Sequence, residues 1–240
     1  MNANQAGSAT SIGERLRRIQ ERAARAALAA GFPGRGPRIV AVSKRQPIEK
    51  IREAYAAGQR DFGENYVQDL VTRSAALADL GDLRWHMIGH VQRNKARLLV
   101  PLAHYIHTVD SAKLAVELGK RQRAADPQAP GALRALVEVN IAGDSNKSGC
   151  SAAEVGDVLA AVEAEPGLEL CGLMTVPPVE ADPGRTRAHF EALRALRDAN
   201  GGVERLPELS MGMSDDFELA IQAGATMVRV GTAIFGPREQ

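Results

Sequence analysis

The chain has 240 residues, and 30 Lys and Arg residues against 29 Asp and Glu residues give a formal net charge of +1. This balance argues against a general nucleic-acid-binding protein, which usually carries a strong basic excess. Hydrophobic residues make up 45% and charged residues 25%, as in a globular protein and unlike a disordered chain. No apolar run reaches the roughly 20 residues that span a bilayer. Two cysteines are too few for a disulfide framework, so we expect a cytoplasmic protein.

The N-terminal region is predicted to contain a tail followed by one amphipathic helix. Residues 1–11 are small and polar and show no apolar period, which predicts a disordered tail. Apolar residues in the segment 12–30 recur at helical spacing and would share one face of a helix. Glu14 and Glu21 argue against a transit peptide, because such peptides avoid acidic residues. We therefore expect this helix to pack on the folded domain.

Beyond Gly31, short runs rich in Val, Ile and Leu alternate with helical stretches. The predicted strands are 39–44, 60–65, 83–89, 105–110, 133–141, 168–176, 208–214 and 227–235. The predicted helices between them lie near 47–57, 67–79, 92–100, 111–125, 151–164, 184–199 and 215–223. Gly58 and Gly224 stand where helices would end in a left-handed residue, and Ser111 and Ser151 stand where helices would be capped.

The alternation implies parallel strands joined by helices. Eight such units predict a single (β/α)8 TIM barrel with an extra N-terminal helix, one domain over residues 12–240. A doubly wound open sheet is the rival fold, but the glycine-rich dinucleotide fingerprint is missing after the first strand. No helix is predicted after the eighth strand, so the helix at 12–30 is expected to fill that gap in the outer ring.

In such a barrel, functional groups lie at the carboxyl ends of the strands. This rule selects Lys44, Asn65, His90, Asp110, Asn140, Thr175, Ser214 and Thr232. Lys44 shares a strand face with Val40 and Val42. If that face lines the barrel, desolvation lowers the pKa of the lysine, and the neutral amine is what a Schiff base with an aldehyde requires. The alternative is a surface lysine just past a strand end.

The last two strands carry a second signal, because barrels often bind phosphate in the loops after strands seven and eight. Such a site needs small residues, exposed backbone N–H groups and hydroxyl donors. Gly212, Gly231, Ser210, Ser214 and Thr232 supply them. The alternative is that the glycines only relieve crowding at the rim of the barrel.

Arg229 is the third signal, because it shares a strand face with Gly231 and would point into the barrel, where an arginine needs an acceptor. The acceptor is either a carboxylate, such as Glu138 in a structural ion pair, or a ring nitrogen. His86 and His90 do not make a metal site, because four residues of strand separate them by about 13 Å. No metal site is predicted.

Seven motifs then occur in a fixed order along the chain. They are Ala41-Val42-Ser43-Lys44, Phe62-Gly63-Glu64-Asn65-Tyr66-Val67-Gln68, Trp85-His86-Met87-Ile88-Gly89, Gln92-Arg93-Asn94-Lys95, Lys147-Ser148-Gly149, Ser210-Met211-Gly212-Met213-Ser214 and Arg229-Val230-Gly231-Thr232. Together they resemble the pyridoxal phosphate homeostasis protein family, which is similar to the N-terminal barrel domain of alanine racemase. The resemblance runs from about residue 12 to residue 236.

This resemblance implies a cofactor and a site. Pyridoxal 5′-phosphate would be held as a Schiff base on Lys44, with Arg229 facing its pyridine nitrogen and Asn65 beside it. The resemblance implies that the phosphate is held by Ser210, Gly231 and Thr232, with backbone N–H groups near Gly212 and Met213.

The resemblance also implies a role with little or no catalysis. A guanidinium only donates, so Arg229 would keep the ring nitrogen unprotonated and the cofactor a weak electron sink. The second domain of alanine racemase, with its catalytic tyrosine, is not expected here. We expect a monomeric protein of pyridoxal phosphate (vitamin B6) homeostasis and delivery, with apo-enzymes that use the cofactor as recipients. The alternatives are a racemase-like enzyme that uses pyridoxal phosphate and a Schiff-base aldolase that binds a sugar phosphate directly.

Overall fold

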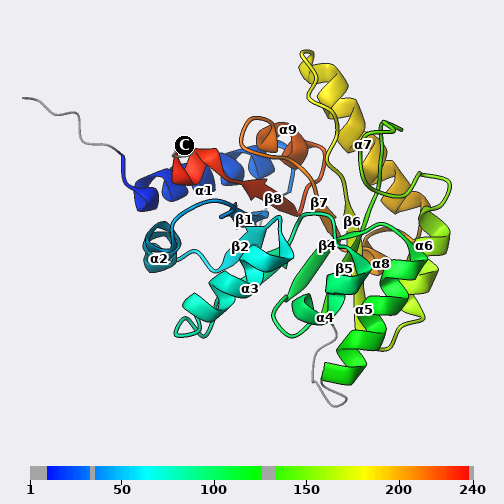
Figure 1. Cartoon of the computed structure of the whole chain (residues 1–240). Coiled ribbons are helices and arrows are strands. Elements are labelled where there is room, and N and C mark those ends of the chain that lie inside the picture. The colour runs from blue at the N-terminus through cyan, green and yellow to red at the C-terminus, as the bar shows by residue number, and fades with distance from the viewer. Residues whose placement is uncertain (1–9, 33–35, 126–132, 238–240) are drawn as a thin grey trace, which may run out of the picture.

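The computed structural model describes residues 10–32, 36–125 and 133–237. Eight parallel strands close into a barrel in chain order, and the helices surround it (Figure 1). The strands are β1 (Arg38–Val42), β2 (Asp61–Glu64), β3 (Arg84–Met87), β4 (Tyr105–Val109), β5 (Leu133–Glu138), β6 (Leu168–Met174), β7 (Glu208–Ser210) and β8 (Met227–Val230). The predicted (β/α)8 barrel is confirmed.

The helices lie between the strands, as predicted, with two short additions. They are α1 (Ile12–Ala29), α2 (Ile48–Ala56), α3 (Val67–Ala76), α4 (Ala96–Leu99), α5 (Ala112–Ala125), α6 (Val155–Glu163), α7 (Pro183–Ala199), α8 (Gly202–Arg205), α9 (Phe217–Gln222) and α10 (Thr232–Phe235). A 3₁₀ turn, Arg93–Lys95, precedes α4. The sequence predicted neither α8 nor α10.

The end of the barrel corrects the predicted eighth strand, 227–235. The strand stops at Val230, and Gly231, with φ −113° and ψ −82°, turns the chain into the short helix α10. The carbonyl of Gly231 accepts the N–H groups of Ile234 and Phe235, both at 2.9 Å. An apolar run this short fits a strand or one helical turn equally well. The expectation that no helix follows β8 is therefore wrong.

Helix α1 closes the outer ring, as expected. It contacts α9 and α10 on one side and α2 on the other, and Figure 1 shows it beside the C-terminal helix. Ser11 begins this helix, because its Oγ accepts the N–H of Glu14 at 3.1 Å. The predicted tail therefore ends before Ser11, and its residues 1–9 lie outside the described part of the chain.

Three of the four predicted helix-end signals are confirmed. Gly58 and Gly224 have φ values of 97° and 106°, where a Cβ would be strained. Ser111 Oγ accepts the N–H of Leu114 at 3.4 Å. The cap at Ser151 is wrong: α6 begins at Val155, and the N–H and hydroxyl of Ser151 both donate to the Glu154 carboxylate within the preceding turn.

The strand alternation decides what lines the barrel. Ile39 and Ala41 belong to the hydrophobic core between barrel and helices. Val40 faces inward, where a Cβ added to Gly63 would lie only 3.0 Å from its side chain and 2.9 Å from that of Ile88. Inward-facing positions on β1 therefore run from Val40 through Val42 towards Lys44.

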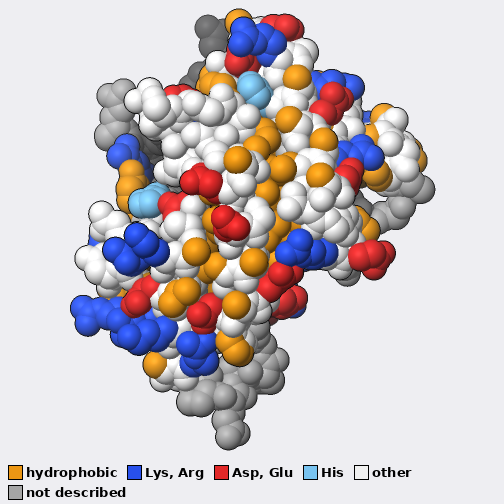
Figure 2. Space-filling view, turned by 90° about the vertical axis from the view of Figure 1, so that its right-hand side faces the viewer, with side chains coloured by type: hydrophobic (Ala, Val, Ile, Leu, Met, Phe, Trp, Pro, Cys, Tyr) orange, Lys and Arg blue, Asp and Glu red, His pale blue; other side chains and the backbone are white. Residues whose placement is uncertain are grey.

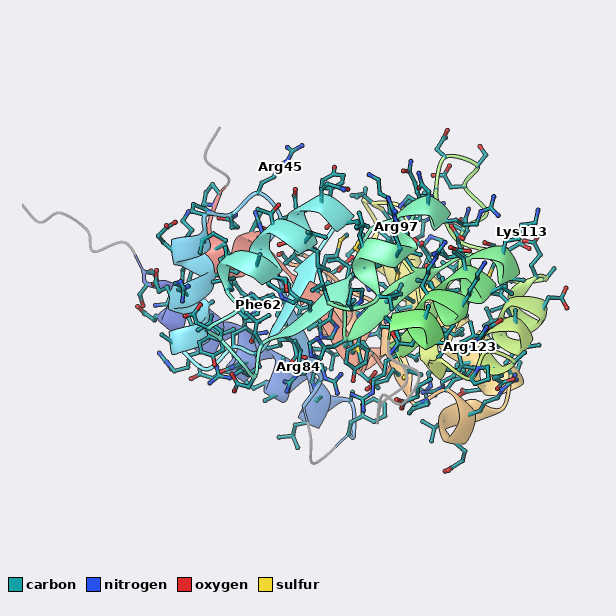
Figure 3. The ribbon with its side chains drawn as sticks, turned by 60° about the horizontal axis from the view of Figure 1, so that its bottom comes forward. Arg45, Phe62, Arg84, Arg97, Lys113 and Arg123 are labelled. Atoms are coloured by element: carbon teal, nitrogen blue, oxygen red, sulfur yellow. The ribbon has the colours of Figure 1, made fainter. Side chains whose placement is uncertain are left out.

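The barrel has two distinct ends. Arg45, which follows β1, projects at the carboxyl end of the strands, and Arg84, which opens β3, projects at the other end, with Phe62 between them (Figure 3). The face that carries α5, α6 and α7 mixes acidic and basic side chains around a band of apolar ones (Figure 2). None of the helices in the described ranges is long and apolar enough to cross a membrane.

Candidate functional site

Lys44 lies in the turn that follows β1, at the carboxyl mouth of the barrel. Val42 pairs with Gly63 on β2, and the N–H of Ser43 donates to the carbonyl of Gly63 at 3.0 Å. On the other side, β1 pairs with β8. Lys44 is half-buried. The turn therefore places Lys44 at the barrel mouth, next to the ends of β2 and β8, and its role there stays a prediction.

A buried charged cluster holds this turn from behind. The Ser43 hydroxyl donates to Glu64 Oε1 at 2.6 Å, and the Arg73 guanidinium binds the same carboxylate and the Ser43 carbonyl. Glu64 is fully buried. The next residue, Arg45, adopts a left-handed conformation with φ 59°, which is uncommon for a residue with a Cβ. Arg73 also donates to the Gln46 carbonyl at 3.0 Å, so these contacts hold the backbone on both sides of Lys44.

Asn65 follows β2 and carries an unmet hydrogen-bond acceptor. Its Oδ1 is buried and has no hydrogen-bond partner among the described residues. Its backbone is pressed against Gly89, where an added Cβ would lie 2.1 Å from the Asn65 carbonyl oxygen. Buried polar atoms are nearly always paired. The position therefore suits a ligand that brings a donor.

Arg229 points into the barrel from β8 and is 4% exposed. Its Nη1 donates to Ser210 Oγ at 2.7 Å, and its Nη2 donates to the Thr175 carbonyl at 2.8 Å. Burial lowers the pKa of Arg229 to about 10. Arg229 and Glu138 do not form the ion pair that the sequence left open, and Glu138 acts on Arg229 only through its charge.

A chain of hydrogen bonds continues from Arg229 across the barrel interior. Ser210 Oγ lies 2.8 Å from His107 Nδ1, His107 Nε2 lies 2.9 Å from His86 Nδ1, and His86 Nε2 lies 2.9 Å from Asp61 Oδ1. Burial lowers the pKa of both histidines, which favours neutral rings. Arg229 can only donate and an ionised Asp61 can only accept, so every donor in the chain points from Arg229 towards Asp61.

This relay is a feature that sequence reasoning missed. Its members come from β2, β3, β4, β7 and β8, and only the closed barrel brings them together. Burial acts to raise the pKa of Asp61, but hydrogen bonds from Arg84 and His86 hold it below its usual range. The one signal in the sequence was a polar residue at an inward position of each of these strands.

Ser210 and Ser214 occupy different places, although both were candidates for the phosphate site. Ser210 is fully buried, and its hydroxyl is engaged by Arg229 and His107. Ser214 is half-buried, and its Oγ accepts the N–H groups of Gly231 at 3.3 Å and Ala233 at 3.5 Å. The geometry therefore favours Ser214 over Ser210 as the hydroxyl beside Gly231 and the exposed Thr232.

Gly212 and Met213 shape the loop between β7 and α9. Gly212 has φ 91°, and a Cβ there would lie 2.5 Å from that of Ala220. Its carbonyl accepts the N–H of Arg229 at 3.0 Å. The N–H of Met213 donates to Asp216 at 2.6 Å, so this amide is already occupied. A role for these two backbones at a phosphate stays a prediction.

The other strand-end candidates have structural partners. His90 Nδ1 pairs with Asp110 at 3.1 Å on the rim. The Asn140 side chain binds the backbone of its own loop, donating to the Asp144 carbonyl at 2.7 Å. The Thr175 hydroxyl donates to the Val139 carbonyl at 2.8 Å.

Glu138 is a second residue that sequence reasoning did not place in the site. It is 7% exposed, and its Oε2 has no hydrogen-bond partner among the described residues. Burial, helped by the charge of Asp110, raises the pKa of Glu138 to about 7. This carboxyl therefore changes its charge near neutral pH, and it lies close enough to Arg229 for that change to alter the electrostatic potential at the guanidinium.

Metal and thiol chemistry find little support. In the described ranges, no group of three or more His, Cys, Asp and Glu side chains could hold a metal ion. Cys150 and Cys171 are buried and not disulfide-bonded, and burial raises the pKa of both thiols to about 12. Neither is suited to act as a nucleophile at neutral pH.

Comparison with known proteins places this barrel in a family. Residues 15–239 match the family model of the alanine racemase N-terminal domain. A pyridoxal phosphate homeostasis protein of Pseudomonas aeruginosa is 42% identical over 96% of this chain and 97% of its own length. One from Escherichia coli is 41% identical over 95% of this chain and 97% of its own length.

Solved structures of related proteins have the same barrel fold. PipY of Synechococcus elongatus with pyridoxal phosphate bound has a TM-score of 0.81 and 36% identity, covering 94% of this chain and all of PipY. Alanine racemase of Corynebacterium glutamicum, at 20% identity and a TM-score of 0.69, covers 94% of this chain but only 61% of its own, and shows the shared fold alone. This chain therefore belongs to the pyridoxal phosphate homeostasis proteins, within the family of the alanine racemase N-terminal domain.

Proposed function

We propose that this protein binds pyridoxal 5′-phosphate at the carboxyl mouth of the barrel and serves its homeostasis and delivery, with little or no catalysis. The observation that carries the proposal is the convergence of a half-buried lysine, a buried arginine and a glycine–hydroxyl cluster at one mouth. The bound ligand of PipY, a relative at 36% identity, supports the same choice of cofactor.

The residues present fit this cofactor. Ser214 Oγ already accepts two backbone N–H groups, at Gly231 and Ala233, which is the arrangement that a phosphate oxygen would use. Asn65 offers a buried acceptor without a partner. We assign the aldehyde end to Lys44, the ring nitrogen to Arg229, and the phosphate to Ser214, Gly231 and Thr232. Ser210 acts behind them by holding Arg229.

Arg229 argues for weak catalysis. When bound, pyridoxal phosphate stabilises negative charge on an attached amino acid, and it does so best with a protonated ring nitrogen. A guanidinium donor keeps that nitrogen unprotonated. Racemisation also needs acid–base groups on both faces of the substrate. Beyond Lys44, the candidates are Tyr66, which is 55% exposed, and His90, which is paired with Asp110. Both side chains are exposed to water.

A homeostatic role requires reversible binding and recipients. The rim residues Tyr66, Met213 and Thr232 are exposed, so an incoming amine would reach Lys44 from solvent. We propose a monomer in the cytoplasm that passes the cofactor to apo-enzymes. Transfer from the loaded protein to an apo-enzyme faster than from free cofactor supports this role, and transfer no faster than that contradicts it.

The decisive experiment is the absorption spectrum of the purified full chain with pyridoxal phosphate, before and after borohydride. We expect a yellow protein, and reduction should attach the cofactor to the peptide that contains Lys44. The Lys44→Ala variant should remain colourless, whereas Lys50→Ala, at the nearest other lysine, should behave like wild type. A wild-type protein that stays colourless refutes the proposal and favours the aldolase.

Turnover assays separate the remaining alternative. Racemisation of an amino acid by the loaded protein, lost in Lys44→Ala, would establish a racemase-like enzyme. We expect no turnover above that of free pyridoxal phosphate.

A further inference from the structure

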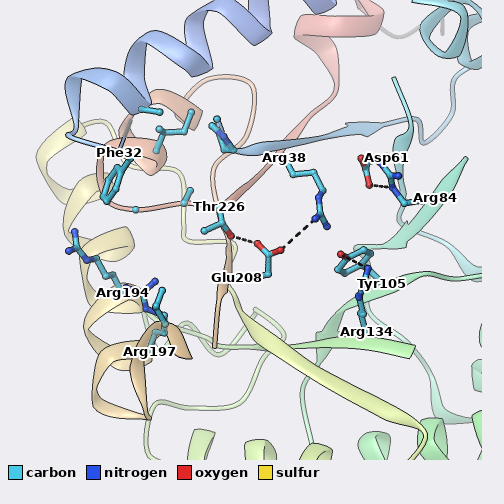
Figure 4. Close-up of a pocket in the computed structure, with 17 residues that line it drawn as sticks. Phe32, Arg38, Asp61, Arg84, Tyr105, Arg134, Arg194, Arg197, Glu208 and Thr226 are labelled. Carbon is cyan, nitrogen blue, oxygen red and sulfur yellow. Dashed lines mark hydrogen bonds and ion pairs between the residues drawn. The ribbon is translucent and has the colours of Figure 1, made fainter. Parts of the chain in front are cut away.

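A large cavity opens at the amino end of the barrel, opposite to Lys44. Its volume is about 750 Å³. The first residues of several strands form its base, and α7 together with Phe32 and Pro37 forms its walls (Figure 4). The charged and aromatic side chains at the base are Arg38, Asp61, Arg84, Tyr105, Arg134 and Glu208. The proposed cofactor site uses none of them.

The cavity is strongly basic. Five arginines and only two carboxylates line it. Three of the arginines have close carboxylate partners: Arg84 binds Asp61 at 2.7 and 2.9 Å, Arg197 binds Asp198 at 2.8 Å, and Arg134 binds Glu169 at 3.1 Å. Neither Arg38 nor Arg194 has a carboxylate oxygen within 3.5 Å among the described residues. Their nearest carboxylate oxygens lie at 3.7 Å on Glu208 and 3.9 Å on Asp198.

Arg38 is held in place, but its guanidinium lacks hydrogen-bond acceptors. Its guanidinium lies over the ring of Tyr105, 5.0 Å from the centroid, and that ring stacks on His86. Its Nη1 is buried and has no hydrogen-bond partner in the described part of the chain. Glu208 cannot turn fully to Arg38, because its other oxygen accepts the Thr226 hydroxyl at 2.5 Å. A fixed guanidinium with spare donors is the usual means of recognising a carboxylate or phosphate.

The opposite wall indicates the rest of the ligand. Phe32 and Val203 line the cavity and remain 43% and 53% exposed, although both are large and apolar. Figure 4 shows Arg38 at the centre of the cavity, with Phe32 and Arg194 on the far side. A ligand that bridges these groups has an anionic end and an apolar body.

We propose that this cavity binds a small organic anion, with its carboxylate or phosphate group on Arg38 and an apolar body that extends towards Phe32 and Val203. The proposal stands apart from the proposed cofactor site, because no residue that lines this cavity is assigned to pyridoxal phosphate. It gives the amino end of the barrel a binding role of its own.

The test measures binding of phenyl phosphate and phenylacetate to the full chain loaded with pyridoxal phosphate, by calorimetry at constant ionic strength. The two probes share a ring and differ in the anion, so their relative affinities identify the preferred group. Benzyl alcohol is the uncharged control. We expect saturable binding of at least one anion and none of the alcohol.

Three variants locate the bound anion. Arg38→Gln should weaken binding about tenfold or more, since it removes a charged hydrogen-bond donor from the anion. Arg194→Gln, across the cavity from Arg38, should weaken it less. Arg187→Gln removes the same charge from α7 two turns away, outside the cavity lining, and should leave the affinity unchanged. Should Arg38→Gln not fold, Arg38→Lys, which keeps the charge but loses the forked pair of donors, decides alone and should also weaken binding. Absence of saturable binding, or equal affinities across all variants, overturns the proposal.

Discussion

At the scale of single residues, Glu138 links pH to stability. Burial raises the pKa of its carboxyl to about 7 in the folded protein, above the usual value of 4.5. Because the pKa is higher in the folded state, the protonated carboxyl stabilises the fold, and this contribution is complete below about pH 4.5. The contribution is lost as the pH rises through about 7. Above neutral pH, the fold must bury an ionised carboxylate whose Oε2 has no partner among the described residues.

We therefore expect Glu138→Gln to gain stability relative to wild type as the pH rises from about 5 to about 8, by roughly 1–3 kcal/mol. Urea unfolding at several pH values measures this difference. The exposed Glu191→Gln serves as control and should show no such trend. A difference between Glu138→Gln and wild type that stays constant over this range contradicts the argument.

Gly89 is a second case in which one residue decides local structure. An added Cβ would lie 2.1 Å from the Asn65 carbonyl oxygen, which is backbone and cannot give way cheaply. We expect Gly89→Ala to destabilise the fold by about 1–3 kcal/mol and to weaken cofactor binding through Asn65. Gly81→Ala, where nothing lies within 4 Å, should be close to neutral. Thermal unfolding with and without pyridoxal phosphate compares the two, and equal effects would refute the steric account.

At the scale of elements, β8 and α10 meet the loop after β7 at Ser214. Its Oγ accepts the N–H groups of Gly231 and Ala233, whereas Ser210, on β7 itself, supports Arg229. We expect Ser214→Ala to weaken pyridoxal phosphate binding about tenfold, because a direct charged hydrogen bond is lost. Ser210→Ala should change the absorption spectrum of the bound cofactor through Arg229 more than it changes affinity. Absorbance titrations of the two variants with pyridoxal phosphate measure both effects. If Ser210→Ala weakened binding and Ser214→Ala did not, Ser210 would be the residue that binds the phosphate.

The elements also show where sequence reasoning stopped. Alternation of apolar runs with helical stretches was enough for the barrel, because this pattern leaves few packed arrangements. The ends of β7 and β8 were not predictable, because Gly212 and Gly231 end their strands through backbone angles that an apolar run does not reveal. At the candidate site, strand ends and strand faces singled out Lys44 and Arg229, whose roles stay predictions. The relay through His86 and His107 was not predicted, because its partners meet only across the closed barrel.

At the scale of the whole molecule, the relay connects the two mouths of the barrel. It begins at Asp61, which lines the basic cavity, and ends at Arg229 below the proposed cofactor site. Both histidines are fully buried, so each hydrogen bond lost leaves a polar group without water. The relay should therefore behave as one unit in stability.

A double-mutant cycle of His107→Leu and Ser210→Ala tests this. Each single change leaves a neighbour unpaired, and we expect a cost of about 1–3 kcal/mol for each. The double variant removes both members of one hydrogen bond, so it should cost less than the sum by about 0.5–3 kcal/mol. His90, on the rim, pairs only with Asp110 in the described structure. The stability cost of His90→Leu should therefore add to that of Ser210→Ala without coupling. Additive costs for His107 and Ser210 would mean that the two residues are buried neighbours without shared energetics, and that the basic cavity has no hydrogen-bonded route to Arg229.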